Sequence, residues 1–194
     1  MNCTMRGWQS FGKMKQPASR SSPIRIIVSA LSLSAAGLIG IVVREGYTDS
    51  AVVPTQGDKA TYGFGSTVQA DGTPVKMGDK TTPVRALVTA QAHLSREEQQ
   101  FRDSLPGVEL TQGEYDIYVD FMYQYGITNW RSSSMRRNLL TGNYHSACDS
   151  LLSFRKAGGY DCSTMVNGQP NTRCWGVWTR QLERHEKCLA EQSQ

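Results

Sequence analysis

The chain has 194 residues, of which 39% are hydrophobic and 20% are charged, a balance that predicts one globular domain with a substantial core plus an appendage. The formal net charge of +4 is too small to indicate nucleic-acid binding, so no nucleic-acid partner is predicted. A mildly basic surface suits an anionic polymer as a partner, but an ordinary solvated surface explains the same charge.

Two segments precede the predicted globular part. Residues 1–25 contain several Lys and Arg but no Asp or Glu, and their Ser, Gly and Pro content predicts a disordered basic tail. Residues 26–43 contain no charged residue, and as a helix they would span about 27 Å, just enough to cross the hydrocarbon core of a bilayer. The basic flank predicts that the N-terminus stays in the cytoplasm.

Three interpretations of residues 26–43 are open. A cleaved signal peptide needs small residues after the apolar run, whereas the Ala-Ala-Gly sequence at residues 35–37 lies inside it. A buried globular helix does not explain the basic, acid-free tail. A marginal membrane anchor fits best, because several Ser and Gly residues weaken insertion. The small residues Ser32, Ala36 and Gly40 would then let a released helix pack against the domain or a partner.

The strongest chemical motif follows the apolar segment. It begins with Glu45, after which a turn at Gly57 and Asp58 separates two short extended runs, so a small hairpin is predicted. The hairpin leads into T-Y-G-F-G-S-T at residues 61–67, whose glycines leave room for another group to approach the backbone. A carboxyl group at a helix end, facing such a hairpin, is able to grip and protonate a sugar oxygen.

This stretch resembles the active-site entry of the phage-type lysozymes (glycoside hydrolase family 24), in which a Glu precedes an Asp and a T-x-G-x-G-x-T run. The resemblance implies an α+β, lysozyme-like fold: a small β-hairpin lobe and a larger helical lobe with a cleft between them, after an N-terminal apolar helix. It implies that Glu45 is the proton donor, that peptidoglycan is the substrate and that no metal or organic cofactor is required. Residues 26–43 in turn resemble the signal-anchor-release segments of some phage endolysins, which are exported tethered to the membrane and become active on leaving it.

The sequence leaves the second catalytic group open. Counting back from Thr61, the family's Asp position falls on Thr55, and its spacing from Glu45 is one residue longer than in the family. Thr55 and Thr61 are predicted to hold a water for attack on the opposite face of the sugar, as inverting glycosidases require. A shifted hairpin would instead make Asp58 or Asp49 the base, although Asp58 also suits a turn on conformational grounds alone. The retaining or inverting course stays open with it.

Thr82 and Pro83 predict the start of a helix, as a cap and a first helical residue. Glu97 and Glu98 are placed on its wet side, and His93, which has no Cys or His at ligand spacing, is expected to be an exposed polar residue. The apolar stripe of this helix is predicted to comprise Val84, Leu87, Val88, Gln91, Leu94 and Phe101.

A capping box of Thr111 and Glu114 predicts the start of a central helix. In the family an F-x-x-x-x-G motif ends this helix, which corresponds here to Gly126. An A-G-G element at residues 157–159 and a G-x-x-x-R-x-x-E helix at residues 176–183 also match the family, in the correct order. The resemblance therefore covers most of the chain after the apolar segment.

The cysteines are divided by the apolar segment. Cys148, Cys162, Cys174 and Cys188 follow it, whereas Cys3 precedes it on the predicted cytoplasmic side. Export to an oxidising compartment would permit two disulfides. Cys162 and Cys174 bracket a Gly/Asn/Pro-rich loop and are the preferred local pair, which leaves Cys148 with Cys188 among three possible connectivities. A zinc site is the alternative, but no C-x-x-C pair is present.

The predicted organisation is a basic cytoplasmic tail (residues 1–25), a signal-anchor-release segment (residues 26–43) and a lysozyme catalytic domain (residues 44–194). The expected activity is hydrolysis of the β-1,4 bonds between N-acetylmuramic acid and N-acetylglucosamine in peptidoglycan, which causes host cell lysis. The protein is expected to be exported, to be held in the host inner membrane facing the periplasm, and to be a monomer when released there. The missing Asp keeps a rival interpretation open, a catalytically inactive wall-binding or structural protein.

Overall fold

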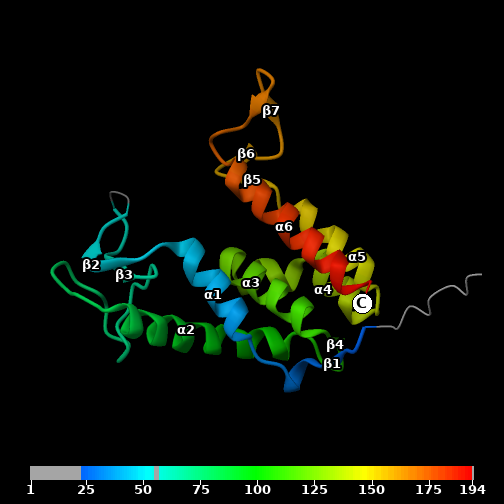
Figure 1. Cartoon of the computed structure of the whole chain (residues 1–194), viewed down its shortest axis with the longest axis horizontal. Helices are drawn as coiled ribbons and strands as arrows, with labels where there is room; N and C mark the ends of the chain where they lie inside the picture. Colours follow the sequence, from blue (N-terminus) through cyan, green and yellow to red (C-terminus); the bar gives the residue numbers. More distant parts are fainter. Residues whose placement is uncertain (1–22, 55–56, 194) are drawn as a thin grey trace, which may run out of the picture.

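The computed structural model describes residues 23–54 and 57–193. A small hairpin lobe, residues 47–81, lies at one end of the long helix α2, and a larger helical lobe built around α3 lies at the other (Figure 1). This is the α+β arrangement of two unequal lobes that the sequence predicts.

The helices and strands alternate irregularly along the chain. The α-helices are α1 (Ala35–Glu45), α2 (Pro83–Asp103), α3 (Gln112–Ser132), α4 (Ser134–Leu140), α5 (Tyr144–Ser150) and α6 (Trp175–Glu191). The strands are β1 (Ile26–Ile27), β2 (Thr48–Val52), β3 (Thr61–Gly63), β4 (Glu109–Leu110), β5 (Lys156–Ala157), β6 (Tyr160–Asp161), β7 (Met165–Val166) and β8 (Gln169–Pro170). Short 3-10 helices lie at η1 (Val28–Ala30) and η2 (Leu151–Ser153).

The predicted hairpin is confirmed. β2 and β3 pair antiparallel, with Thr48 opposite Gly63 and Val52 opposite Thr61, and the register shifts between these two pairs. The hairpin lobe has only a small apolar centre, formed by Ala51, Tyr62 and Val75. Each sheet among the described residues has two strands, so most of the stability has to come from the helical lobe.

Aromatic side chains on α3 form the centre of the helical lobe. Tyr115, Tyr118, Phe121 and Trp130 are fully buried and pack with Phe101 of α2. The indole N–H of Trp130 donates to Ser104 Oγ at 2.8 Å, which satisfies the single polar atom of that side chain. These residues bury a large apolar area on one helix, which explains why α3 lies at the middle of the lobe.

Both predicted ends of the central helix are confirmed. Thr111 Oγ1 accepts from the Glu114 N–H at 3.0 Å, and the Glu114 carboxylate accepts from the Thr111 N–H at 2.9 Å, which completes the capping box. At Gly126 the backbone has φ 80° and ψ 159° and breaks the helical geometry within α3. Glycine reaches this conformation without a Cβ penalty, so the motif marks a kink between two helical pieces.

The buried face of α2 differs from the prediction. Thr82 caps the helix as expected, accepting from the Arg85 N–H at 3.3 Å. Val84 and Val88 are exposed, however, whereas Glu98, which the sequence places on the wet side, is buried. Glu98 Oε1 accepts from the Tyr115 hydroxyl at 2.7 Å and from the Leu33 N–H at 2.7 Å. These distant partners compensate the buried carboxyl, and residue type alone does not reveal them.

Residues 26–43, predicted as one apolar helix, are divided into several elements. Ile26 pairs with Leu110 between β1 and β4, and the Val28 N–H donates to Val108 O at 2.9 Å. Ser34 caps α1, and its side chain also hydrogen-bonds Asp116 of α3. Residues elsewhere in the chain therefore form hydrogen bonds with backbone groups of this segment that would have bonded to one another in a continuous helix.

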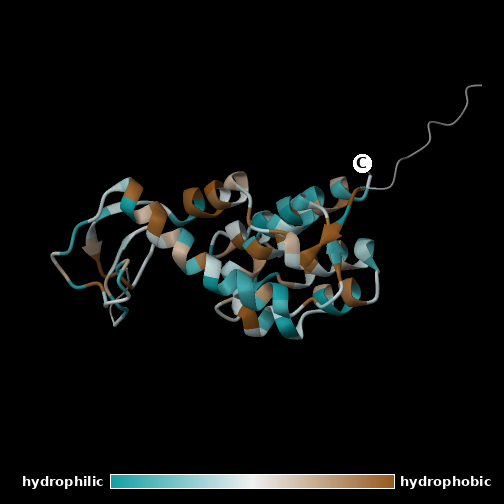
Figure 2. Cartoon of the chain, turned by 90° about the horizontal axis from the view of Figure 1, so that it is seen from below, coloured by the Kyte–Doolittle hydropathy of each residue, from teal (hydrophilic) through white to brown (hydrophobic). Residues whose placement is uncertain are grey.

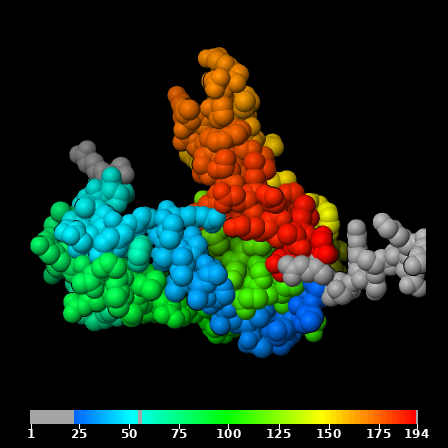
Figure 3. All heavy atoms as spheres, viewed as in Figure 1, coloured from blue at the N-terminus to red at the C-terminus, as the bar shows by residue number. Residues whose placement is uncertain are grey.

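The α1 helix lies on the surface, between the hairpin lobe and α6 (Figure 3). It buries Ile41 and Val42, while Ile39 and Val43 stay exposed. Within residues 23–54 and 57–193, no helix has both the length and the apolar character that a bilayer crossing requires, and the helices in Figure 2 carry hydrophilic as well as hydrophobic segments. The membrane-anchor prediction concerns another state of the chain and stays a prediction.

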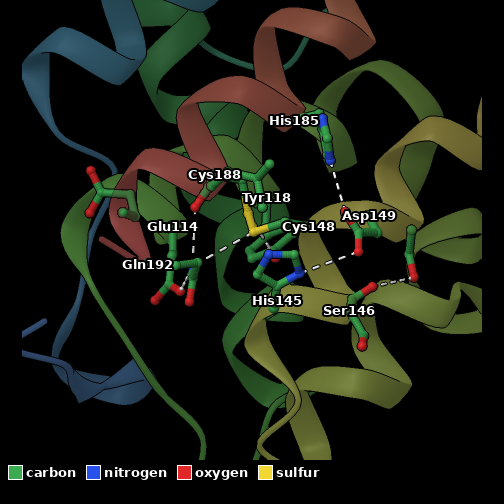
Figure 4. The surroundings of a disulfide bond; sticks show 12 residues. Glu114, Tyr118, His145, Ser146, Cys148, Asp149, His185, Cys188 and Gln192 are labelled. Carbon is green, nitrogen blue, oxygen red and sulfur yellow. Dashed lines mark hydrogen bonds and ion pairs between the residues drawn. A yellow bond between two sulfur atoms is a disulfide. The ribbon is translucent and has the colours of Figure 1, made fainter. Parts of the chain in front are cut away.

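Both predicted disulfides are present, Cys148–Cys188 and Cys162–Cys174. The first joins α5 to α6 inside the helical lobe, next to the Tyr118 hydroxyl and Gln192 (Figure 4). The second closes the loop that contains β7 and β8, within a projecting arm that also contains β5 and β6 and extends beyond the N-terminal end of α6 (Figure 1). Cys3 lies outside the described residues.

Candidate active site

A cavity of about 570 Å³ contains Glu45. It lies where the end of α1, the segment after β3, α2, α3 and α6 come together, at the junction of the two lobes. Its lining combines a glycine-rich strip with charged and hydrogen-bonding side chains: Arg44, Glu45, Phe64, Gly65, Ser66, Thr67, Ala86, Ala90, His93, Glu97, Tyr123, Gln124 and Arg180. A cavity of this size and polarity suits a polar ligand such as a sugar chain.

The end of α1 brings Glu45 to this cavity. Glu45 is the last residue of the helix, and Gly46, with φ 72°, ends it. The preceding residue, Arg44, holds the helix end in place because its guanidinium donates to Asp120 Oδ2 at 3.0 Å and to Glu183 Oε2 at 2.9 Å. The Glu45 side chain is exposed to solvent and therefore accessible to a substrate.

The glycine-rich strip contributes a further part of the lining. A Cβ on Gly63 would come within 2.7 Å of Ala86 Cβ, so only glycine allows the hairpin to lie this close to α2. Tyr62 and Ser66 exchange two backbone hydrogen bonds, of 3.1 and 3.0 Å, which hold the strip in a tight loop. The Phe64 ring packs in a tilted arrangement, 5.4 Å between ring centroids, against Tyr47, which follows Glu45 closely in the chain. The loop and the acid are thus tied together locally.

Three of the residues predicted to supply the second catalytic group, Thr61, Asp58 and Asp49, are not among the lining residues. Thr55 lies outside the described residues. Thr61 begins β3, where its hydroxyl donates to Val52 O at 3.5 Å, and Asp58 lies in the exposed turn of the hairpin. Asp49 is exposed and accepts a hydrogen bond from Ser50 at 3.0 Å. The structure brings Glu45 together with Ser66 and Thr67 instead.

Behind the cavity, Asp120 of α3 binds three guanidinium groups. Arg184 Nε lies 2.7 Å from Oδ2, Arg180 Nη2 lies 2.6 Å from Oδ1, and Arg44 Nη1 lies 3.0 Å from Oδ2. Burial by itself would raise the pKa of Asp120, but Arg184 and Arg180 outweigh it, and the net effect lowers this pKa. The cluster ties α1, α3 and α6 together directly behind Glu45.

Sequence reasoning missed several lining residues. His93 and Glu97 are one helical turn apart on α2, a spacing that places them on one face, and both side chains line the cavity. Tyr123 and Gln124 follow the aromatic core of α3. Arg180 was matched only as part of the closing helix motif. The i, i+4 spacing of His93 and Glu97 was the one local feature of the sequence that could have indicated a shared site for lining residues.

No group of three or more His, Cys, Asp or Glu side chains with metal-binding geometry occurs in the part of the chain that the structure describes. The side chains that line the cavity offer carboxyl, imidazole, phenol, amide and guanidinium groups. Such groups support proton transfer and hydrogen bonding to sugars.

The chain is similar to several phage proteins. Residues 43–173 match the family model described as "Phage lysozyme". The curated "Endolysin" of Salmonella phage P22 is 29% identical over 133 residues, which cover 66% of this chain and 86% of that protein. The "Endolysin" of Bacillus phage B103 is 29% identical over 150 residues, 74% of this chain and 53% of that protein. The solved "Endolysin from Escherichia coli O157:H7 phage FAHEc1" has a TM-score of 0.67 and 26% identity, with 82% of this chain and 94% of that chain covered.

Proposed function

Because this chain belongs to the phage lysozyme family, we propose that it is an endolysin that hydrolyses the β-1,4 bond between N-acetylmuramic acid and N-acetylglucosamine in peptidoglycan and thereby lyses the host cell. The observation that carries the proposal is the position of Glu45 at the end of α1, in a cavity that the loop from Gly65 to Thr67 also lines. Both curated relatives are named endolysins.

In this mechanism Glu45 donates the proton to the leaving glycosidic oxygen. Hydrolysis also requires a water on the opposite face of the sugar and a group that orients or deprotonates it. Backbone groups of the loop that contains Gly65 and side chains such as Gln124 are suited to hold the sugar, since they offer hydrogen bonds at fixed positions. The rigid attachment of Arg44 to Asp120 keeps the acid in place during the reaction.

The proposal includes an exported precursor that is tethered in the inner membrane by residues 26–43 and faces the periplasm, with release as a monomer. This part of the proposal is supported by the two environments that residues 26–43 would occupy: the segment cannot span the membrane and pack into the folded domain at the same time. In the folded state Val28 and Ile41 are buried in the domain, whereas a spanning helix would place both in lipid. Glu45 follows the segment so closely that tethering would also pull the acid out of the cavity.

The test of the activity is the release of reducing ends from purified peptidoglycan. Glu45→Gln is expected to lower the rate by about 10²–10⁴-fold with an unchanged melting temperature, because the side chain is exposed. Glu186→Gln, an exposed acid on α6 outside the cavity, is the matched control and is expected to retain the parent rate. Parent activity retained in Glu45→Gln would contradict the mechanism. A parent protein that binds the wall without releasing reducing ends would instead favour the inactive wall-binding alternative.

The test of the tether is expression in a host whose export pathway is blocked. Lysis is expected to disappear while full-length protein accumulates, because the domain cannot then reach the wall. Lysis that continues under the block would contradict the tether and leave the assignment of the enzyme activity untouched.

A further inference from the structure

Glu97 of α2 is a second carboxyl group in the cavity that contains Glu45. The two acids come from different elements, the end of α1 and the middle of α2, and Tyr123 of α3 lines the same cavity. The cavity therefore has two carboxyl groups even though the family's Asp position is occupied by Thr55, which lies outside the described residues.

The Glu97 carboxyl is incompletely bonded. Its Oε2 atom is buried and has no hydrogen-bond partner among the described residues. His93 Nδ1, one turn earlier on α2, lies 3.8 Å away, beyond hydrogen-bond distance. A buried carboxylate oxygen without a donor is unfavourable, so the charged form of this carboxyl is disfavoured and its affinity for a proton is raised, as a base that takes a proton from water requires.

The next residue in the chain, Glu98, has the hydrogen-bond donors that Glu97 Oε2 lacks among the described residues. Glu98 points to the other side of α2, where Tyr115, Arg102 and the Leu33 N–H all donate to it. Both carboxyl groups are on the same helix, but the Glu97 side chain is 31% exposed and the Glu98 side chain 8%, and only Glu98 has several donors. The acid that lines the cavity thus has a buried oxygen without a hydrogen-bond partner among the described residues, as expected of a reactive group rather than a structural one.

The four helices that line the cavity all contribute charged or titratable groups besides Glu97: His93 on α2, Glu45 and Arg44 on α1, Tyr123 on α3 and Arg180 on α6, whereas the segment after β3 contributes none. Burial raises the pKa of Glu97, and the His93 imidazole partly opposes that rise. Burial also raises the pKa of Tyr123 to about 12, with further contributions from the charges of Glu45 and Glu97. Tyr123 is thus close enough to sense both acids, and it remains protonated at neutral pH.

We propose that Glu97 is the general base of this cleft and deprotonates the water that attacks the sugar. The inference rests on the proposed glycoside hydrolase function and adds the group that the sequence leaves open. The water oxygen forms a bond to the anomeric carbon and gives one proton to Glu97, while the bond from that carbon to the leaving oxygen breaks and Glu45 protonates that oxygen. The cycle closes when the proton on Glu97 leaves to solvent and Glu45 takes one up.

The assignment predicts an inverting course, because the water is activated directly and no glycosyl-enzyme bond forms. The parent enzyme is expected to release the α-anomer first from the β-linked substrate, which can be measured by NMR at early times. A β-anomer as first product would overturn the proposal.

The decisive variant is Glu97→Ala. Its kcat is expected to fall by about 10²–10⁴-fold, with KM changed less than about threefold, since the base acts in the transition state. Sodium azide is expected to restore turnover and give an α-glycosyl azide, because azide is already anionic and needs no base. Asp103→Asn, an exposed acid on the same helix outside the cavity, is the matched control and is expected to behave as the parent.

Glu97→Gln separates charge from volume, since it keeps the shape of the side chain. It is expected to be as slow as Glu97→Ala and to lose the acid limb of the pH–rate profile that the parent shows. A Glu97 variant that keeps at least half of the parent kcat, or that azide does not accelerate, would overturn the proposal while leaving the function of Glu45 intact. A parent protein without any glycosidase activity would remove the proposed function and this inference together.

Discussion

The helix α3 borders two regions, the interior of the helical lobe and the cavity, and they differ in how many hydrogen-bond and ion-pair partners their carboxyl groups have. In the interior of the helical lobe, Asp120 is held by three arginines at distances of 2.6 to 3.0 Å. In the cavity one turn further along the helix, Tyr123 lies near two acids, and one of them, Glu97, has an oxygen without a hydrogen-bond partner among the described residues. A saturated carboxylate stabilises the fold, whereas an unsaturated one leaves capacity for a substrate or a proton.

Arg180 connects these two regions. Its Nη2 donates to Asp120, while its Nε is buried and has no hydrogen-bond partner among the residues described. Because the same side chain also lines the cavity, the interior cluster is continuous with the site. Changes in the interior are therefore expected to reduce stability, and changes in the cavity to reduce activity. The predictions below test that division, beginning with the largest effect on stability.

Removing the disulfide in the interior is expected to have the largest effect. Replacing Cys148 and Cys188 together by Ser opens a loop of 40 residues, for which the chain-entropy relation gives a loss of about 4 kcal/mol. The loss can be measured by urea unfolding under oxidising conditions. The matched control is the double replacement of Cys162 and Cys174, whose shorter loop of 12 residues predicts about 3 kcal/mol. A greater loss for the arm disulfide would contradict the view that the interior dominates stability.

Neutralising Asp120 is expected to rank next. Asp120→Asn leaves three guanidinium groups without their shared partner, and removing one member of a buried ion cluster costs about 3 kcal/mol. Activity should fall as well, because Arg44 would no longer hold the end of α1 that carries Glu45. Urea unfolding at pH 7 measures the stability, with the exposed Asp103→Asn as control. A loss below about 1 kcal/mol would show that the arginines stabilise one another through other contacts.

The sequence predicted those parts of the fold that depend on local chemistry. The capping box of Thr111 and Glu114, the break at Gly126 and the hairpin follow from residues close together in the chain. The buried acid Glu98 and the divided segment at residues 26–43 do not, because their partners are far away in sequence. Leu33, for example, donates its N–H to Glu98 at 2.7 Å across 65 positions.

The same distinction applies to the site. Glu45 could be predicted because it precedes a recognisable glycine-rich motif. Glu97 was predicted to be a solvated residue, since one face of a helix cannot be assigned to a cavity until the opposing elements are known. The apolar stripe of α2 shows why: it was right at Leu94 and Phe101, which are buried, but wrong nearer the start of the helix, where Val84 and Val88 are exposed.

The two regions are also expected to differ in how their acids make stability depend on pH. The folded-state pKa of Asp120 is lowered, so its stabilising contribution is complete above its unfolded pKa of about 3.9 and is lost as pH falls through the lower folded value. The difference in melting temperature between the parent and Asp120→Asn should therefore be largest near neutral pH and shrink below about pH 4. A difference that is constant down to pH 2 would show that the charge on Asp120 is not what stabilises the cluster.

The smallest expected effect has the opposite sign. Burial raises the folded-state pKa of Glu97, so the unfolded chain ionises first, and stability falls as pH rises from about 4 through that raised value. Glu97→Gln cannot ionise, so it should match the parent at pH 3 and exceed it at pH 7 by less than about 1 kcal/mol, measured as melting temperature against pH. The adjacent Glu98→Gln is the matched control and should lose stability, because Tyr115 and Arg102 donate to that carboxylate. If Glu97→Gln instead loses stability as Glu98→Gln does, the cavity holds its acid by favourable contacts, and the contrast between the two regions fails. If it gains stability while activity is lost, Glu97 is maintained for its chemistry at the expense of the fold, as is common for groups that act on a substrate.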